Sequence, residues 1–227
     1  MPSRLHVAKA DLNLDASFTQ PEFSLFRDTD GLLQSLFARL QQHGLRLQDM
    51  KIERGTGSVG EFHVACYLYN FMMAVRVRPE KIEIGCFEVP ENYVERLLAA
   101  IVDALLAVQS HLPSLIFRAH TMGVALHGTL DGESVKQYLS KFVGNVPSGL
   151  GPQIGSGAVF YFGAEDDRLL SSVTVDLSAV LTDGLFVRLY VVWDAKKLQV
   201  AAIPSQATGF ARHALDCFGL EVPTLRS

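Results

Sequence analysis

The amino-acid sequence predicts an α+β fold made of two similar β-α-β-β-β-β-α halves, with a mainly antiparallel sheet and packed helices. Three observations lead to this prediction. Four segments carry apolar residues at helical spacing between residues that start and end helices. Between those segments, apolar and polar residues alternate with the period of a strand. The same order of elements then occurs twice along the 227 residues.

The first half opens with a long alternating segment, Leu5 to Phe18, which we expect to form a strand. A helix follows, with Asp28, Thr29 and Asp30 as candidate capping residues at its start and Gly44 at its end. The half closes with a second helix that begins at Pro90, a residue suited to a first helical position. The apolar stripe of that helix reaches Leu105 and predicts burial of one wide face.

The second half repeats this order. It opens with a strand from Leu115 to Leu130, followed by a short helix from near Asp131 to Gly144. Its closing helix is expected to be capped by Ser205 and to end at Gly219.

Four strands are expected between the two helices of each half. Leu185 to Trp193 has apolar residues on both faces, so we expect a central strand that is covered on both sides. Glu165 to Asp167 predicts a hairpin turn. Near Asn70 the pattern allows either a chain reversal or one long bent strand from Glu61 to Arg78.

The internal similarity predicts a duplication, with an N-terminal half at 1–112 and a C-terminal half at 113–227. Its best local match aligns Lys81–Cys86 with Lys197–Ala202, since each segment precedes the closing helix of its half. The junction contains no flexible Gly/Ser tract, so we expect the halves to form one compact unit. The element order resembles that of a functionally uncharacterised, sporadically distributed bacterial family of duplicated α+β halves, a resemblance that implies no activity and no site.

Composition narrows the class of protein. Hydrophobic residues make up 48% and charged residues 19%, which provides for a packed core and argues against disorder. The net charge of −4 argues against a nucleic-acid binder. The longest apolar run, Leu97 to Val108, is interrupted by Asp103 and predicts a helix that does not insert in a membrane. The N-terminus lacks the apolar stretch of a signal peptide, and we therefore expect a soluble cytoplasmic protein.

Two glycine-rich segments are considered as possible nucleotide-binding loops. Gly55–Gly60 matches the spacing Gly-x-Gly-x-x-Gly, but a phosphate cradle needs a helix after it, and a strand-like segment follows here. The loop at 144–157 also leads into a strand and lacks the lysine of a phosphate-binding loop. It is interpreted either as a plain connection or as a lid or partner-contacting loop.

Catalytic and metal-binding patterns are also weak. The seven histidines are dispersed, and His120 and His127 share a strand but have an odd spacing that places them on opposite faces. Cys66, Cys86 and Cys217 lie in apolar runs and are interpreted as buried thiols. We therefore expect no cofactor and no metal site, and the sequence favours binding over catalysis.

Two functional hypotheses remain. The first is a non-catalytic protein-binding or assembly module that contacts a protein partner or self-associates into a homo-oligomer through exposed sheet edges. The alternative is a binder of an apolar small molecule between a curved sheet and the long helix at 90–110. Five apolar residues are the candidate lining of such a pocket, although residues of this kind also fill ordinary cores: Phe62, Met72, Met73, Phe160 and Phe162.

Overall fold

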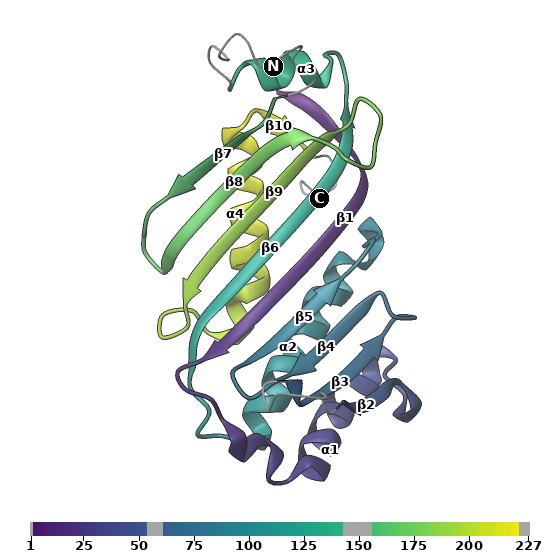
Figure 1. Ribbon diagram of the computed structural model, residues 1–227, viewed down its shortest axis with the longest axis vertical. Helices are drawn as coiled ribbons and strands as arrows, with labels where there is room; N and C mark the ends of the chain where they lie inside the picture. The colour runs from purple at the N-terminus through teal and green to yellow at the C-terminus, as the bar shows by residue number, and fades with distance from the viewer. Residues whose placement is uncertain (1, 54–60, 143–155, 223–227) are drawn as a thin grey trace.

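A computed structural model describes residues 2–53, 61–142 and 156–222 and contains one ten-stranded sheet with helices packed against it (Figure 1). The strands are β1 (Ser3–Phe18), β2 (Met50–Glu53), β3 (His63–Leu68), β4 (Met73–Val77), β5 (Lys81–Cys86), β6 (Phe117–Leu130), β7 (Ala158–Phe162), β8 (Arg168–Leu177), β9 (Leu185–Asp194) and β10 (Leu220–Glu221). The α-helices are α1 (Thr29–Leu40), α2 (Val94–His111), α3 (Val135–Ser140) and α4 (Ile203–Cys217).

The strand order is β2-β3-β4-β5-β1-β6-β9-β8-β7, and every pair along this path is antiparallel, while β10 lies parallel to β1. The expected α+β class is therefore confirmed. The two longest strands, β1 and β6, form the centre of the sheet and pair from Leu5 opposite Leu130 to Phe18 opposite Phe117. This ladder joins the N-terminal and C-terminal halves in a single sheet.

The arrangement on the two sides of the central pair is similar. β5, β4 and β3 follow β1 on one side, and β9, β8 and β7 follow β6 on the other. β2 continues the first series, and no described strand continues the second. The duplication itself stays a prediction.

The expectation of a fourth strand in the second half, at the segment 197–202 that aligns with 81–86, is wrong. The backbone N–H groups of Lys197 and Leu198 both donate to the carbonyl of Asp194, which closes a turn, and a 3-10 turn follows at Val200–Ala202. The described part of the second half therefore has a three-stranded meander. By position in the sheet, the counterpart of β5 is β9, so the alignment of 81–86 with 197–202 fails.

Only some of the helix ends follow the sequence signals. The Asp28 carboxylate accepts a hydrogen bond from the Gly31 N–H at the start of α1, and Gly44 ends the segment with φ 87°. Pro90 differs from the expectation, because its ψ of 147° is extended and a short 3-10 turn precedes α2. The helix expected from near Asp131 begins later, at Val135, where Ser134 forms a capping box. α4 begins before the expected cap, Ser205, which lies in its first turn.

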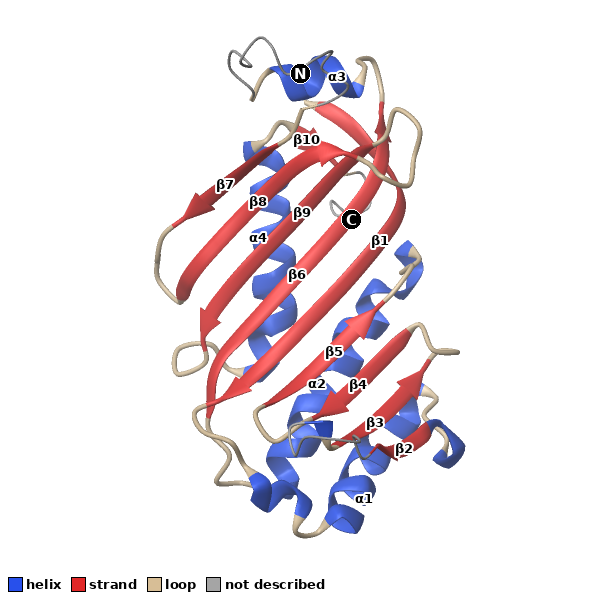
Figure 2. Ribbon diagram, in the orientation of Figure 1, coloured by secondary structure: helices blue, strands red, loops and turns tan. Residues whose placement is uncertain are grey.

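The two faces of the sheet differ. Figure 2 shows α1, α2 and α4 behind the sheet, and none of the described helices lies in front of it. Along β9, the residues that face the helices are fully buried, as in the case of Trp193. On the opposite face of β9, Arg188 is exposed, and Phe186, Tyr190 and Val192 are half-buried. The expectation of a central strand is thus confirmed for β9, but the expected cover on both faces is wrong for the described residues.

None of the described helices is long and apolar enough to cross a membrane.

Candidate functional site

The five residues expected to line an apolar pocket lie in two separate places. Met73 is completely buried in β4, and Met72 packs beside the same core. Phe62 contacts Phe26 edge-to-face, with ring centroids 4.8 Å apart. These residues belong to the side of the sheet that contains β3 and β4.

The other two candidates belong to β7, beyond the central strands β1 and β6. Phe160 packs against the rings of Phe142 and Phe218, and Phe162 is 46% exposed. The strand order therefore separates the five residues into two groups. The side of α2 that faces the sheet is buried among core residues, which include Ile101 and Leu105. Neither of the two cavities described below lies between α2 and the sheet.

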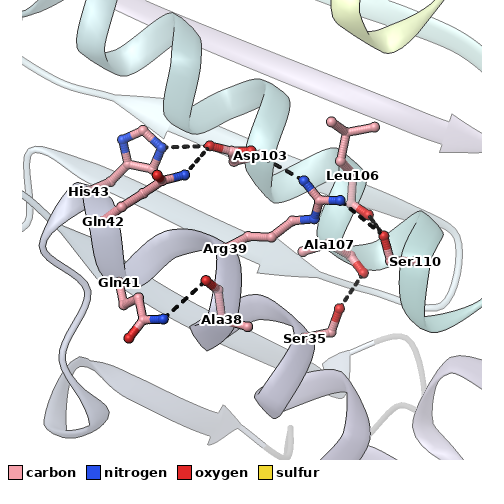
Figure 3. Close-up of polar contacts among 10 residues, drawn as sticks. All are labelled: Ser35, Ala38, Arg39, Gln41, Gln42, His43, Asp103, Leu106, Ala107 and Ser110. Carbon is pink, nitrogen blue, oxygen red and sulfur yellow. Dashed lines mark hydrogen bonds and ion pairs between the residues drawn. The ribbon is translucent and has the colours of Figure 1, made fainter.

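A polar cluster around Asp103 connects α1 to α2 (Figure 3). Asp103 Oδ2 accepts hydrogen bonds from His43 Nε2 at 2.8 Å and from Gln42 Nε2 at 2.9 Å. Asp103 Oδ1 lies 3.5 Å from Arg39 Nη1. The carboxylate is 20% exposed, so these donors replace much of its hydration. One turn further along α2, Ser35 Oγ donates to the carbonyl of Ala107 at 2.7 Å.

His43 extends this cluster towards the turn between β3 and β4. Its Nδ1 lies 3.3 Å from the Tyr69 hydroxyl, so the imidazole bridges a carboxylate and a phenol. A neutral ring with its proton on Nε2 satisfies both contacts, since Nδ1 then accepts from the hydroxyl. Burial raises the pKa of Tyr69, which keeps the phenol protonated at neutral pH. Arg39, Gln42, His43, Tyr69 and Asp103 therefore form a structural clamp between α1, α2 and the β3–β4 turn, because each side chain provides a hydrogen-bond or ion-pair partner for another.

A cavity of about 230 Å³ adjoins the clamp. Its lining residues are His43, Gly44, Arg46, Asp49, Tyr67, Tyr69, Asn70 and Phe71. Tyr69, Asn70 and Phe71 have φ values of 52°, 55° and 68°. Three consecutive left-handed residues reverse the chain here, so the alternative of one long bent strand is wrong. Arg46, the main cation of the cavity, is already paired with Asp49 at 2.7 Å.

A second, open hollow of about 530 Å³ lies between α2 and α4. Its lining is mostly small, and it has a charged residue from each helix: Glu95, Leu98, Ala99, Pro204, Ser205, Thr208, Gly209 and Arg212.

The two edges of the sheet present different chemistry. β2 is four residues long and includes Lys51 and Glu53, and charges of this kind discourage strand addition. β7 contains no charged residue, and no described strand pairs with its outer edge. Val159 and Tyr161 on the helix-free face are 49% and 74% exposed. β7 is therefore an uncharged and largely solvent-exposed edge strand.

The expectation that all three cysteines are buried is confirmed for two of them. Cys66 and Cys86 are buried, and burial raises the pKa of both thiols to about 12. The expected burial of Cys217 is wrong, because it lies on the exposed side of α4, with Sγ 3.6 Å from His213 Nε2.

His120 and His127 lie on opposite faces of β6, as expected: the first is buried under the helices and the second is half-buried on the helix-free face. In the part of the chain that the structure describes, no three His, Cys, Asp or Glu side chains gather as a metal site would need. The glycine-rich segment 55–60 and the loop residues 144–155 lie outside the described residues.

Sequence reasoning did not identify the clamp, although its signal is present. Asp103 is a charged residue inside the otherwise apolar run from Leu97 to Val108, and such a residue needs polar partners when it is partly buried. The partners His43 and Tyr69 come from elements 60 and 34 positions earlier in the chain, a convergence that spacing along one helix does not indicate.

Comparison with known proteins gives no match to a family model and no match to a curated protein. The resemblance inferred from the order of the elements therefore stays a prediction.

Proposed function

We propose that this protein is a non-catalytic binding module that takes up an extended segment of a polypeptide along the outer edge of β7. The observation that carries the proposal is the outer edge of β7, which is uncharged and pairs with no described strand, whereas the other edge strand, β2, contains Lys51 and Glu53. Strand addition supplies main-chain hydrogen bonds to such an edge, and side chains on alternate positions supply specificity.

The side chains of β7 suit this mode of binding. Val159 and Tyr161 project from one face of the strand and remain largely in contact with solvent. Phe160 projects to the other face and is anchored by Phe142 and Phe218, so the strand is held in place before a partner binds. A preorganised strand loses less conformational entropy on binding than a flexible one.

The two buried cysteines and the clamp histidine support binding over catalysis. The buried thiols of Cys66 and Cys86 have pKa values raised to about 12, so they are poor nucleophiles at neutral pH. In the clamp, Asp103 and Tyr69 both engage His43, which leaves neither nitrogen of the ring directed at a substrate.

A peptide with the sequence of residues 156–164, made soluble by added lysines, provides a direct test. Hydrogen exchange at 158–162 should slow when this peptide is added, because a new ladder protects the outward-facing amides. A scrambled peptide is the control for general hydrophobic association. Tyr161→Lys should weaken the protection, whereas Val180→Lys, which changes an exposed apolar residue outside the sheet, should not. Unchanged exchange at β7, or protection at a different strand, would contradict the proposal.

A further inference from the structure

We infer that the segment taken up by β7 is β7 of a second copy of this chain, paired antiparallel about a two-fold axis, so that two ten-stranded sheets become one. This inference rests on the proposed function and names the partner. The axis passes at Phe160, which lies opposite its own copy, and Val159 of each copy lies opposite Tyr161 of the other.

The side chains of β7 are self-complementary in this register. The two Val159–Tyr161 pairs are contacts between a β-branched and an aromatic residue on the helix-free face, and such pairs stabilise neighbouring strands. On the other face, the two Phe160 rings extend the aromatic cluster that already contains Phe142 and Phe218. No charged side chain of β7 is forced against its own copy, because the strand has none.

Charge outside the strand selects the antiparallel orientation. The turn that follows β7 contains Glu165, Asp166 and Asp167. In the antiparallel pair the two acidic turns lie at opposite ends of the new ladder. A parallel pair would place them side by side, where like charges repel.

The other edge of the sheet limits the assembly to two copies. Continued growth would require β2 to accept a strand, and β2 carries Lys51 and Glu53. Glu53 is also engaged by His63 Nε2 at 3.2 Å and by the Tyr67 hydroxyl at 3.3 Å. A two-fold contact through β7 alone gives a closed dimer and not a fibre.

The expected dimer is weak. A five-residue strand contact is smaller than the roughly 1,200–2,000 Å² that a stable interface buries. We therefore expect dissociation on dilution, and the measurement needs a series of protein concentrations.

Sedimentation equilibrium of the full chain tests the register with five proteins. The wild type should be a dimer at high concentration. Tyr161→Lys and Val159→Glu should each raise the dimer dissociation constant by about tenfold, because each substitution removes both Val159–Tyr161 pairs. The double variant Val159→Glu/Tyr161→Lys should restore dimerisation, since each Glu then lies opposite a Lys of the other copy. Val180→Lys is the matched control and should dimerise as the wild type does.

The outcomes separate this inference from the proposed function. A wild type that stays monomeric at every concentration overturns the pairing of two whole chains, while the proposed function stands if the isolated 156–164 peptide still protects β7. A dimer that tolerates Tyr161→Lys, or a double variant that stays monomeric, overturns the β7 register. Far-UV circular dichroism confirms that each variant is folded, which is expected because both substituted side chains are largely exposed.

Discussion

Acidification should destabilise the protein through one buried histidine. His120 faces the helices from the centre of the sheet and is 1% exposed. Its cross-strand neighbours are Ala16 and Trp193, both buried, and its ring centroid lies 5.2 Å from that of Phe117. Nδ1 of His120 has no hydrogen-bond partner among the described residues. Burial therefore lowers the pKa of His120 to about 4, because the imidazolium would lose its hydration in this environment.

The size of this destabilisation follows from the difference between the pKa of His120 in the unfolded chain and its pKa in the folded protein. The pKa of the imidazole is 6.5 without burial and about 4 in the folded protein. At 1.36 kcal/mol for each pKa unit, the neutral ring contributes about 3 kcal/mol of pH-dependent stability. Between these two values the unfolded chain binds more protons than the folded protein. The contribution is complete above pH 6.5 and is lost as the pH falls from 6.5 towards 4.

Urea unfolding at several pH values between 4 and 7.5, for the wild type and for His120→Leu, measures this contribution. Leucine has a similar volume and cannot be protonated, so the free energy of unfolding of the variant should fall less on acidification, by about 3 kcal/mol. His127→Leu is the matched control, because His127 lies on the same strand but on the helix-free face. Carboxylates titrate in all three proteins and cancel in the comparison. Parallel pH profiles for the wild type and His120→Leu would refute the reasoning.

Three further predictions concern the clamp, the exposed thiol and the two halves. Asp103→Ala should lower the free energy of unfolding, measured in urea, by about 1–3 kcal/mol, because several hydrogen-bond donors lose their acceptor. Asp103→Asn should lower it by less. Equal stability of Asp103→Ala and the wild type would argue against a clamp. Cys217 should react with a thiol reagent in the native protein, whereas the two buried cysteines should react only after denaturation. If native Cys217→Ser reacts with the reagent as much as the native wild type does, the prediction is contradicted. The fragments 1–112 and 113–227, expressed separately, should fail to fold, because separation breaks the β1–β6 ladder. Two monomeric fragments whose amides are protected from hydrogen exchange would contradict this prediction.

The elements that depend on local chemistry could be predicted from the sequence. The Asp28 cap and the Gly44 stop define the first helical segment because they act on neighbouring backbone groups. The segment at 197–202 could not be predicted in this way. Its apolar residues alternate as in a strand, but the Asp194 carbonyl captures two N–H groups that a ladder would need.

The polarity of each face of a strand can be predicted from the sequence, but what covers that face is harder to predict. The second face of β9 carries Phe186, Tyr190 and Val192, and this composition led to the expectation of a covering layer. Neighbouring side chains on the sheet itself half-bury these residues, for example where His127 packs on Phe186 with ring centroids 4.8 Å apart. Periodicity shows which residues share a face, but the partner on that face depends on distant parts of the chain.

The similar strand order on the two sides of the sheet supports the proposed use of β7 as a binding edge. Counted outward from the central β1–β6 pair, β7 occupies the position that β3 occupies on the other side. β2 pairs along the outer edge of β3, from Met50 opposite Cys66 to Glu53 opposite His63. A strand added to β7 would take the place that β2 takes beside β3, and no described strand occupies that place. The geometry of an additional strand thus already exists within this fold, and β7 of a second copy meets its chemical requirement of an uncharged, apolar sequence.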